Sequence, residues 1–166
     1  MTEFNPGKVI LTNLTNLSKN QYDEALLIVR SASKIPQQSF EKYRMTQVKE
    51  LSPSSELFGK YLELRRNNNW NEETFDTIYV PQFIDEIVNG SSHETFGEKG
   101  HELNQIHRKV MNGKTIAIVC FCDNEFCHRY IVGGLLSGVG LTVVSDRNID
   151  IEKYYRMYIE RRKTRV

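Results

Sequence analysis

The stretch that decides the fold is residues 114–138, KTIAIVCFCDNEFCHRYIVGGLLSG. Residues 115–121 form a continuous apolar, β-branched run of strand length, and residues 130–136 carry apolar side chains at helical spacing after a polar break. The stretch therefore predicts a buried strand, a tight loop and a helix. The junction between strand and helix holds all three cysteines of the chain with one histidine and one arginine: Cys120, Cys122, Cys127, His128 and Arg129.

The composition is that of an ordinary globular domain. The chain has 166 residues, 39% of them hydrophobic and 26% charged, and a formal net charge of +1. This length predicts one domain spanning residues 1–166, and the near-zero charge excludes a protein that coats nucleic acid by bulk electrostatics. The cysteines are odd in number and closely spaced, which predicts reduced thiols. The chain has no apolar run of about 18 residues and no signal-peptide start, so we expect a cytoplasmic protein without membrane contact.

Outside the central stretch, strand-like and helix-like segments alternate along the chain. Alternation of this kind predicts a single α/β domain with a mainly parallel sheet flanked by helices, a Rossmann-like three-layer arrangement in which strand 115–121 is central. Residues 34–55 show no clear periodicity, and we expect an irregular segment with one helical turn there. The other expected strands are 9–12, 25–29 and 141–144, and the expected helices are 57–64, 72–87, 103–111 and 151–159.

Capping residues support the helix assignments. Ser54 or Ser55 precedes the first of these helices and Asn71 the second, and both residue types are favoured at helix N-caps. Gly113 follows the third helix, where a glycine can close the last turn in a left-handed conformation.

In a parallel sheet, ligands bind beyond the carboxyl ends of the strands, and the loop after residue 121 occupies such a position. A helix capped by Asp123 or Asn124 would present free backbone N–H groups to an anion there, and Arg129 would add a bidentate fork. Arg30 ends the strand 25–29 and would lie at the same edge. The candidate ligand-binding residues are Arg30, Arg129, Asn13, Cys120, Asp123 and Asn124.

Three interpretations of the cysteine cluster remain open. In the first, Cys122 or Cys127 is a nucleophile and His128 moves its proton, although the spacing does not fit a Cys-x5-Arg phosphatase loop because position 128 is histidine. In the second, the cysteines and His128 bind zinc; spacing argues against this, because adjacent Cys127 and His128 rarely converge on one ion. In the third, the cysteines only pack in the core. We expect no metal and no cofactor.

The segment IVCFCDNEFCHR resembles the signature of an uncharacterised bacterial and phage family, domain of unknown function 488 (DUF488), in which a cysteine after a strand is followed by Cys-His-Arg. Cys120, Cys127, His128 and Arg129 match that pattern. Upstream, LLIVRS is similar to the family strand that ends in Asp-Val-Arg, so Arg30 matches while Ile28 replaces the acidic residue. The resemblance implies a small α/β domain with a role linked to nucleotides or nucleic acids, and no established reaction.

Two further features have both a structural and a functional interpretation. Trp70, Phe75, Tyr79 and Phe83 are expected to pack in the core, and stacking of one ring on a base is the less favoured hypothesis. Residues 149–166 are expected to form a basic helix with six basic against three acidic residues. Such a helix is more often a solvated face than a nucleic-acid contact.

The sequence predicts that the protein binds a nucleotide or other phosphate-bearing small molecule at a Cys/His/Arg anion pocket. Processing of the bound molecule is a second, more specific expectation. One alternative is a non-catalytic protein that sequesters a nucleotide, as a phage would use against a host defence. A second is a nucleic-acid-associated module that uses the basic carboxyl-terminal helix. The sequence names neither the ligand nor a reaction.

Overall fold

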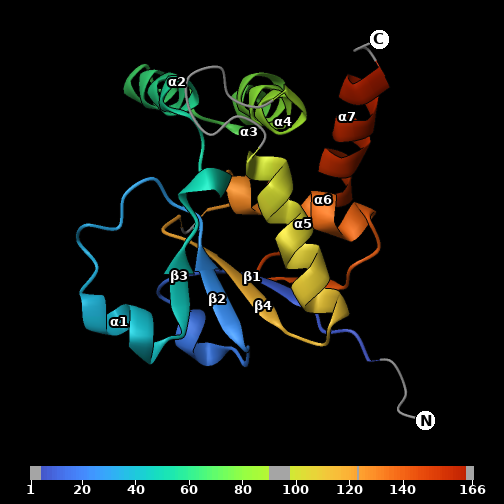
Figure 1. Cartoon of the computed structure of the whole chain (residues 1–166). Helices are drawn as coiled ribbons and strands as arrows, with labels where there is room; N and C mark the ends of the chain where they lie inside the picture. Colours follow the sequence, from blue (N-terminus) through green and yellow to red (C-terminus); the bar gives the residue numbers. More distant parts are fainter. Residues whose placement is uncertain (1–4, 90–97, 123, 164–166) are drawn as a thin grey trace.

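A sheet of five parallel strands forms the centre of the protein (Figure 1). The computed structural model describes residues 5–89, 98–122 and 124–163. The strand order is β3-β2-β4-β1-β5, so β4 is the middle strand, as the sequence predicts. The single-domain α/β fold of the Rossmann-like type is confirmed. The strands are β1 (Val9–Asn13), β2 (Glu24–Leu27), β3 (Met45–Gln47), β4 (Ile116–Cys120) and β5 (Val143–Ser145).

Strands β1 and β4, both inside the sheet, are buried on both faces, which is why their sequences are nearly continuous apolar runs. They pair in register from Val9 opposite Ile116 to Asn13 opposite Cys120. Cys120 is therefore the last residue of the middle strand, and the chain that follows it lies at the carboxyl edge of the sheet.

The helical segments are more numerous than the sequence predicts. The first 3₁₀ turn, η1, follows β1, and the π-helical turn η3 joins α3 to α4 without a break in the chain. The segments are η1 (Leu17–Lys19), α1 (Gln37–Lys42), η2 (Lys49–Leu51), α2 (Ser55–Arg66), α3 (Glu72–Thr74), η3 (Phe75–Tyr79), α4 (Val80–Asn89), α5 (Glu98–Met111), α6 (His128–Gly138) and α7 (Glu152–Lys163).

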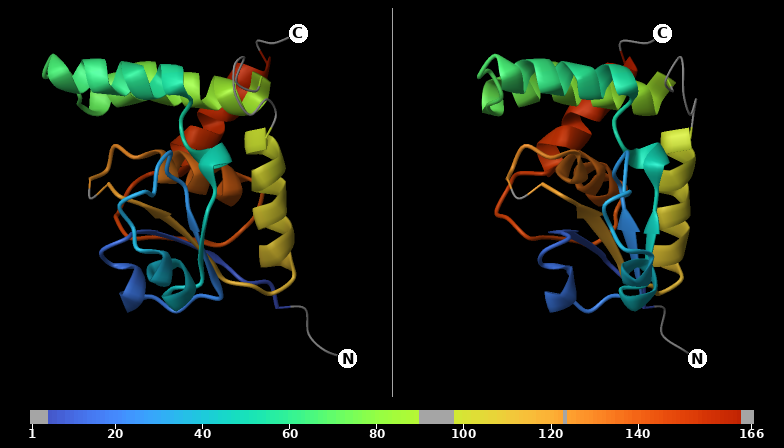
Figure 2. Two further views of the ribbon diagram at one scale, coloured as in Figure 1. Left: turned by 60° about the vertical axis from the view of Figure 1, so that its left-hand side comes forward. Right: turned by 90° about the vertical axis from the view of Figure 1, so that its left-hand side faces the viewer.

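Helices cover the sheet on its faces and across its upper end. Helix α5 lies on one side of the sheet and η1 on the other (Figure 2). Helix α6 packs directly on β1, since a Cβ added to Gly133 would lie 2.4 Å from the Leu11 side chain. Helices α2 and α4 lie across the carboxyl ends of the strands (Figures 1 and 2). The carboxyl edge of the sheet is thus covered by helices.

The predicted caps of α2 and of α3, and the glycine that closes α5, are confirmed. The Ser54 side chain accepts a hydrogen bond from the Leu57 N–H at the start of α2, and Asn71 forms a reciprocal capping box with Thr74. Gly113 has a φ of +98°, the left-handed conformation expected just after α5.

The segment 34–55 is the main difference from the prediction. It contains α1, the edge strand β3 and η2 instead of one helical turn in an irregular chain. Strand β3 has three residues, of which only Met45 is buried, so it shows no apolar periodicity. Its existence depends on pairing with β2, which a local pattern does not encode.

The carboxyl-terminal helix α7 is docked on the domain by paired charges. Arg161 donates to the Asp85 carboxylate of α4, and Lys153 lies 3.0 Å from Asp76. Tyr154 is buried against the core. Within the described residues, no helix is long and apolar enough to cross a membrane.

Candidate functional site

A cavity of about 410 Å³ lies between α2 and the carboxyl ends of β2 and β4. Its volume falls in the usual range of small-molecule sites, about 300–1,000 Å³, and most of its lining is apolar. It is built from the segments after β2 and β4, the start of α6, helix α2 and the turn η3. Fourteen residues line it: Val29, Arg30, Ser31, Pro53, Phe58, Tyr61, Trp70, Tyr79, Cys120, Phe121, Cys122, Phe126, Cys127 and His128.

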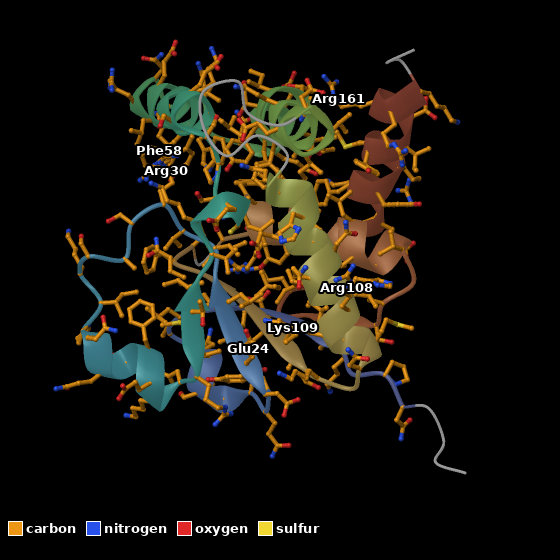
Figure 3. All side chains as sticks on the ribbon, in the orientation of Figure 1. Glu24, Arg30, Phe58, Arg108, Lys109 and Arg161 are labelled. Atoms are coloured by element: carbon orange, nitrogen blue, oxygen red, sulfur yellow. The ribbon has the colours of Figure 1, made fainter. Side chains whose placement is uncertain are left out.

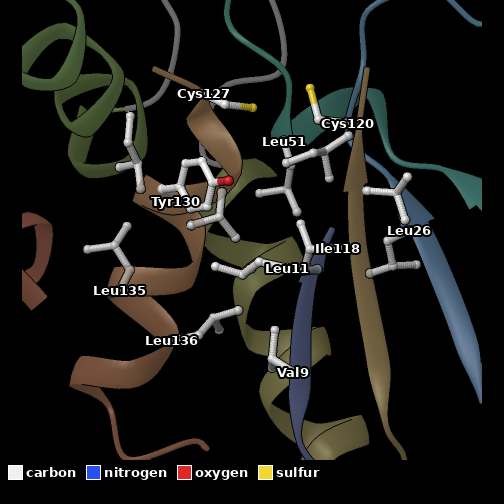
Figure 4. Packing of buried hydrophobic residues seen from close by; sticks show 14 of the residues in the cluster. Val9, Leu11, Leu26, Leu51, Ile118, Cys120, Cys127, Tyr130, Leu135 and Leu136 are labelled. Atoms are coloured by element: carbon white, nitrogen blue, oxygen red, sulfur yellow. The ribbon is translucent and has the colours of Figure 1, made fainter. Parts of the chain in front are cut away.

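The three cysteine thiols gather in one wall of this cavity. All three Sγ atoms lie within 4.8 Å of one another, and those of Cys120 and Cys122 are 3.8 Å apart. Figure 4 shows the sulfurs of Cys120 and Cys127 at the upper end of the packed core, one at the end of β4 and one at the start of α6. Cys120 and Cys127 are buried and Cys122 is half-buried, and all three are free thiols.

The thiols differ in their readiness to ionise. Hydrogen bonds from the Cys122 and Cys127 thiols hold the pKa of Cys120 well below its usual value. The hydrogen bond between the Cys122 and Cys120 thiols raises the pKa of Cys122, and burial raises the pKa of Cys127. Of the three thiols, Cys120 is the one whose pKa its neighbours lower.

His128 is held as a neutral ring with one nitrogen free. Its Nε2 lies 2.6 Å from the Ile28 carbonyl oxygen, and because a carbonyl only accepts, Nε2 carries the proton. Burial lowers the pKa of His128, although the bond to Ile28 opposes that effect. The other nitrogen, Nδ1, is a lone-pair acceptor 4.0 Å from the Cys127 Sγ. His128 Nδ1 can therefore accept a proton from the Cys127 thiol.

Arg129 does not reach the cavity. Its side chain is completely buried and donates to the Cys122 carbonyl oxygen (2.8 Å), the Tyr130 hydroxyl (2.6 Å) and the Asp146 carboxylate (3.1 Å). Burial acts to lower its pKa, but the nearby Cys127, Tyr130 and Asp146 outweigh that effect, and the pKa is raised. The prediction that the Arg129 guanidinium binds an anion in the cavity is therefore wrong. Arg129 is a buried cation whose hydrogen bond holds the Cys122 loop in place.

Arg30 does line the cavity. One of its guanidinium nitrogens donates to the Pro53 carbonyl oxygen at 2.7 Å and another to the Ser55 hydroxyl at 2.8 Å, which bridges the segment after β2 to the start of α2. In Figure 3 Arg30 lies directly below Phe58 of α2. The two predicted arginines are thus separated, with Arg30 at the cavity and Arg129 beneath it.

Aromatic rings form the wall opposite the thiols. The Trp70 ring packs edge-on against Tyr61 at a centroid distance of 4.7 Å and against Tyr79 at 5.4 Å. Phe126, from the cysteine loop, meets the same indole at 6.3 Å. Trp70 and Tyr79 therefore pack, as the sequence predicts, and also expose ring surface to the cavity.

The remaining predicted site residues lie elsewhere. Asn13 is buried, and its side-chain oxygen accepts from the Asn16 N–H, so it shapes the turn after β1. Asn124 accepts from the Phe126 N–H and borders a neighbouring shallow cavity. Asp123 lies outside the described residues. Neither Asn13 nor Asn124 is among the residues that line the main cavity.

The predicted start of α6 is corrected as well. Cys127 is the N-cap residue, with no side-chain capping bond, and the first helical residue is His128. The prediction placed the cap at Asp123 or Asn124 because both are favoured cap residues. The loop after β4 instead continues to Phe126, whose N–H is held in a turn by Asn124. That extra length brings Cys127 back toward Cys120.

Several contributors to the site could not be predicted from local sequence patterns. Phe58 and Tyr61 come from α2, about sixty residues before the cysteines, and their place in the cavity depends on how α2 crosses the sheet. Asp146, the partner of Arg129, follows β5. The proximity of Phe121 and Phe126 to the cysteines is a signal visible in the sequence itself.

Comparison with known proteins gives one match. A protein-family model described as the active DUF488-N3 subclade, DUF488-N3a, matches residues 9–140. No curated protein and no solved structure matches the chain. The matched region runs from β1 to just beyond α6, so it contains the cysteine loop, Arg30 and the whole aromatic wall. The chain therefore belongs to the DUF488 family.

Proposed function

We propose that this protein binds a nucleotide, or a related small molecule with a flat ring and an anionic group, in the cavity between α2 and the sheet, and processes it at the thiol cluster. The observation that carries the proposal is the composition of the cavity wall. Aromatic rings, a guanidinium group and a thiolate-prone cysteine cluster face the same space of about 410 Å³.

The aromatic wall supports the ring-binding part of the proposal. Trp70, Tyr61 and Phe126 are supplied by three separate segments, and each presents ring surface to the cavity. Stacking of a base on an aromatic side chain contributes about 1–3 kcal/mol per base. A planar heterocycle is therefore the guest that gains most from this wall.

Two features support the anionic part. Arg30 lies at the cavity with a guanidinium already oriented by Pro53 and Ser55, and a pre-oriented fork loses little entropy when it binds a phosphate. The N-cap of α6, Cys127, makes no side-chain capping bond, so the first N–H groups of that helix suit an anion. Both features line the same cavity as the rings.

Processing would use the thiols with His128. The Cys120 thiolate attacks an electrophilic carbon of the bound ligand; as the C–S bond forms, the bond to the displaced group breaks, and that group leaves with its electron pair and the Cys127 proton, relayed by His128. Water then hydrolyses the C–S bond, which frees Cys120, and the proton of the water returns to Cys127 through His128. His128 Nδ1 accepts a proton from Cys127 on that side. The sequestering alternative uses the same cavity without this step.

Intrinsic fluorescence tests the binding directly. Trp70 is the only tryptophan of the chain and lies in the cavity wall, so its emission reports on that wall alone. Titration with common nucleoside monophosphates is expected to change the emission saturably, with an affinity at least about tenfold above that of the matching nucleosides.

The control is Trp70→Phe, which keeps a ring in the wall and removes the signal, with binding then followed by calorimetry. An unchanged emission with every nucleotide, together with no heat of binding, would rule out the nucleotide proposal. Equal affinity for nucleotide and nucleoside would rule out its anionic part. Turnover of the bound nucleotide that disappears in Cys120→Ser separates processing from sequestration.

The nucleic-acid alternative receives less support. The basic residues of α7 are drawn into ion pairs, with Lys153 on Asp76, Arg156 on Asp150 and Arg161 on Asp85. Arg162 lies over the Tyr158 ring. A helix whose cations are paired in this way offers a weaker field to phosphates than its composition suggests.

A further inference from the structure

The three sulfurs of the cysteine cluster have the spacing of metal ligands. A tetrahedral zinc ion with Zn–S bonds of about 2.3 Å holds its sulfur ligands about 3.8 Å apart. The Sγ atoms of Cys120 and Cys122 are already 3.8 Å apart, and the third, from Cys127, lies within 4.8 Å of both. Closing the triangle around an ion needs a shift of about one ångström at one side chain.

The loop after β4 explains how the three sulfurs come together. Two cysteines on one extended strand point the same way but stand too far apart to share an ion. Strand β4 ends at Cys120, so Cys122 lies in the loop and turns back toward it. Cys127 is the N-cap of α6 and returns to the strand end after the Phe126 turn.

The surroundings favour a cation held by thiolates. A buried thiol cluster in water-poor surroundings gains by losing protons to a soft divalent ion, because thiolate is the form that binds. Arg129 lies beneath the cluster, bonded to the Cys122 carbonyl oxygen, and offsets part of the negative charge that three thiolates carry. The bond also fixes the position of the Cys122 loop.

The cluster offers three ligands and one open position. Among the described residues, the group contains the three thiols alone, and His128, whose Nδ1 lies 4.0 Å from the Cys127 Sγ, is not part of it. All three cysteines line the cavity, so the fourth position faces the space that a ligand would occupy. Three protein ligands and one exchangeable position are the pattern of catalytic zinc sites.

We propose that Cys120, Cys122 and Cys127 bind one zinc ion in the cavity wall, with the fourth coordination position open to the cavity. The inference goes beyond nucleotide binding and stands on the sulfur geometry alone. With the ion bound, the cysteines act as ligands, and the ion supplies a Lewis acid that polarises an oxygen of a molecule in the cavity. The covalent step described under the proposed function requires the metal-free cluster, so zinc binding would replace that step and leave nucleotide binding in the cavity unchanged.

Cobalt substitution tests the site without any assay of activity. Reduced, chelator-treated protein is titrated with Co²⁺, and thiolate-to-cobalt charge transfer is followed by absorption. All three cysteines of the chain belong to the cluster, so any such band arises there. We expect the absorption to saturate at one equivalent of Co²⁺ and the Co²⁺ to be displaced by Zn²⁺. In the zinc form, none of the three thiols should react with a chromogenic disulfide reagent.

Variants and controls separate zinc binding from folding and from nucleotide binding. Cys120→Ser and Cys127→Ser are each expected to weaken zinc binding at least about a hundredfold while the far-ultraviolet circular dichroism keeps the wild-type form. The absence of a thiolate–cobalt band in the fully reduced wild type overturns the proposal even if the variants fail to fold. Protection of only one or two thiols overturns it too. Nucleotide binding, followed by Trp70 emission with and without chelator, succeeds or fails independently.

Discussion

The Arg129 guanidinium donates to the Asp146 carboxylate at 3.1 Å and to the Cys122 carbonyl oxygen at 2.8 Å, so one completely buried cation joins the segment after β5 to the cysteine loop. The adjacent Tyr130 hydroxyl donates to the same carboxylate at 2.8 Å. The wall of the cavity that carries the thiols is therefore supported by an ion pair on the far side of the loop.

Asp146→Asn is expected to destabilise the protein by about 3 kcal/mol, because it leaves a buried guanidinium without its counter-charge. The measurement is equilibrium unfolding in urea. Asp150→Asn is the matched control: the same change removes an exposed partner of Arg156, and the free energy of unfolding should shift by no more than about 0.5 kcal/mol. Equal losses in the two variants would contradict the assigned role of Asp146.

Gly134→Ala is expected to destabilise the protein by about 2 kcal/mol or more. A Cβ at position 134 would lie 2.1 Å from the Ile151 carbonyl oxygen, and that backbone atom cannot move without shifting the start of α7. The thermal midpoint measures the loss.

Gly59→Ala is the matched control for that substitution. Gly59 also lies inside a helix, α2, but an added Cβ there meets nothing within 4 Å. Since alanine is the better helix former, the thermal midpoint should rise, by the equivalent of about 0.5–1 kcal/mol. A fall in both variants would show that the α6–α7 contact is not the cause.

Ser54→Ala is expected to cost about 1–3 kcal/mol, because the side chain serves two partners. It accepts from the Leu57 N–H at 3.1 Å and donates to the buried Glu86 carboxylate of α4, whose second partner is Lys99 at 3.5 Å. Since α2 carries Phe58 and Tyr61, the same change should weaken ligand binding as well as folding.

Urea unfolding and Trp70 emission together measure both effects in Ser54→Ala. The matched control is Ser33→Ala, an exposed serine that is hydrogen-bonded to Ser31, and it should leave stability within about 0.5 kcal/mol. If both serine variants unfold at the wild-type urea concentration, Ser54 does not anchor α2.

Arg30→Gln is expected to lower nucleotide affinity by about tenfold to a hundredfold and to leave nucleoside affinity within about twofold, because the lost contact is charge-assisted. Calorimetry with the two ligands measures the difference. Arg108→Gln removes the same charge from an exposed position on α5 and should change neither affinity. A loss in Arg108→Gln would instead indicate a bulk electrostatic effect.

The fold could be predicted where local pattern and tertiary environment agree. The apolar runs of β1 and β4 and the caps Ser54, Asn71 and Gly113 each act within a few residues of their own position, and each is found as expected. The strand β3 was missed because its stability derives from pairing with β2 and not from its own sequence.

The candidate site could be predicted only in part, for a related reason. Position at a strand end indicated the cysteine loop and Arg30, and both line the cavity. The direction of the Arg129 side chain depends on Asp146, which is seventeen residues away, and no local pattern connects them. The convergence of the three thiols depends on the residue at which β4 ends. An apolar run in the sequence does not show where that residue is.

The thiols of the cavity and most of its aromatic rings come from separate lengths of chain. Every sulfur is supplied within residues 120–127, whereas Phe58, Tyr61, Trp70 and Tyr79 come from residues 55–79. Substitutions in the second stretch can reshape the ligand space while the thiols stay in place. Under the proposed function, relatives that share the Cys-His-Arg segment need not share a ligand.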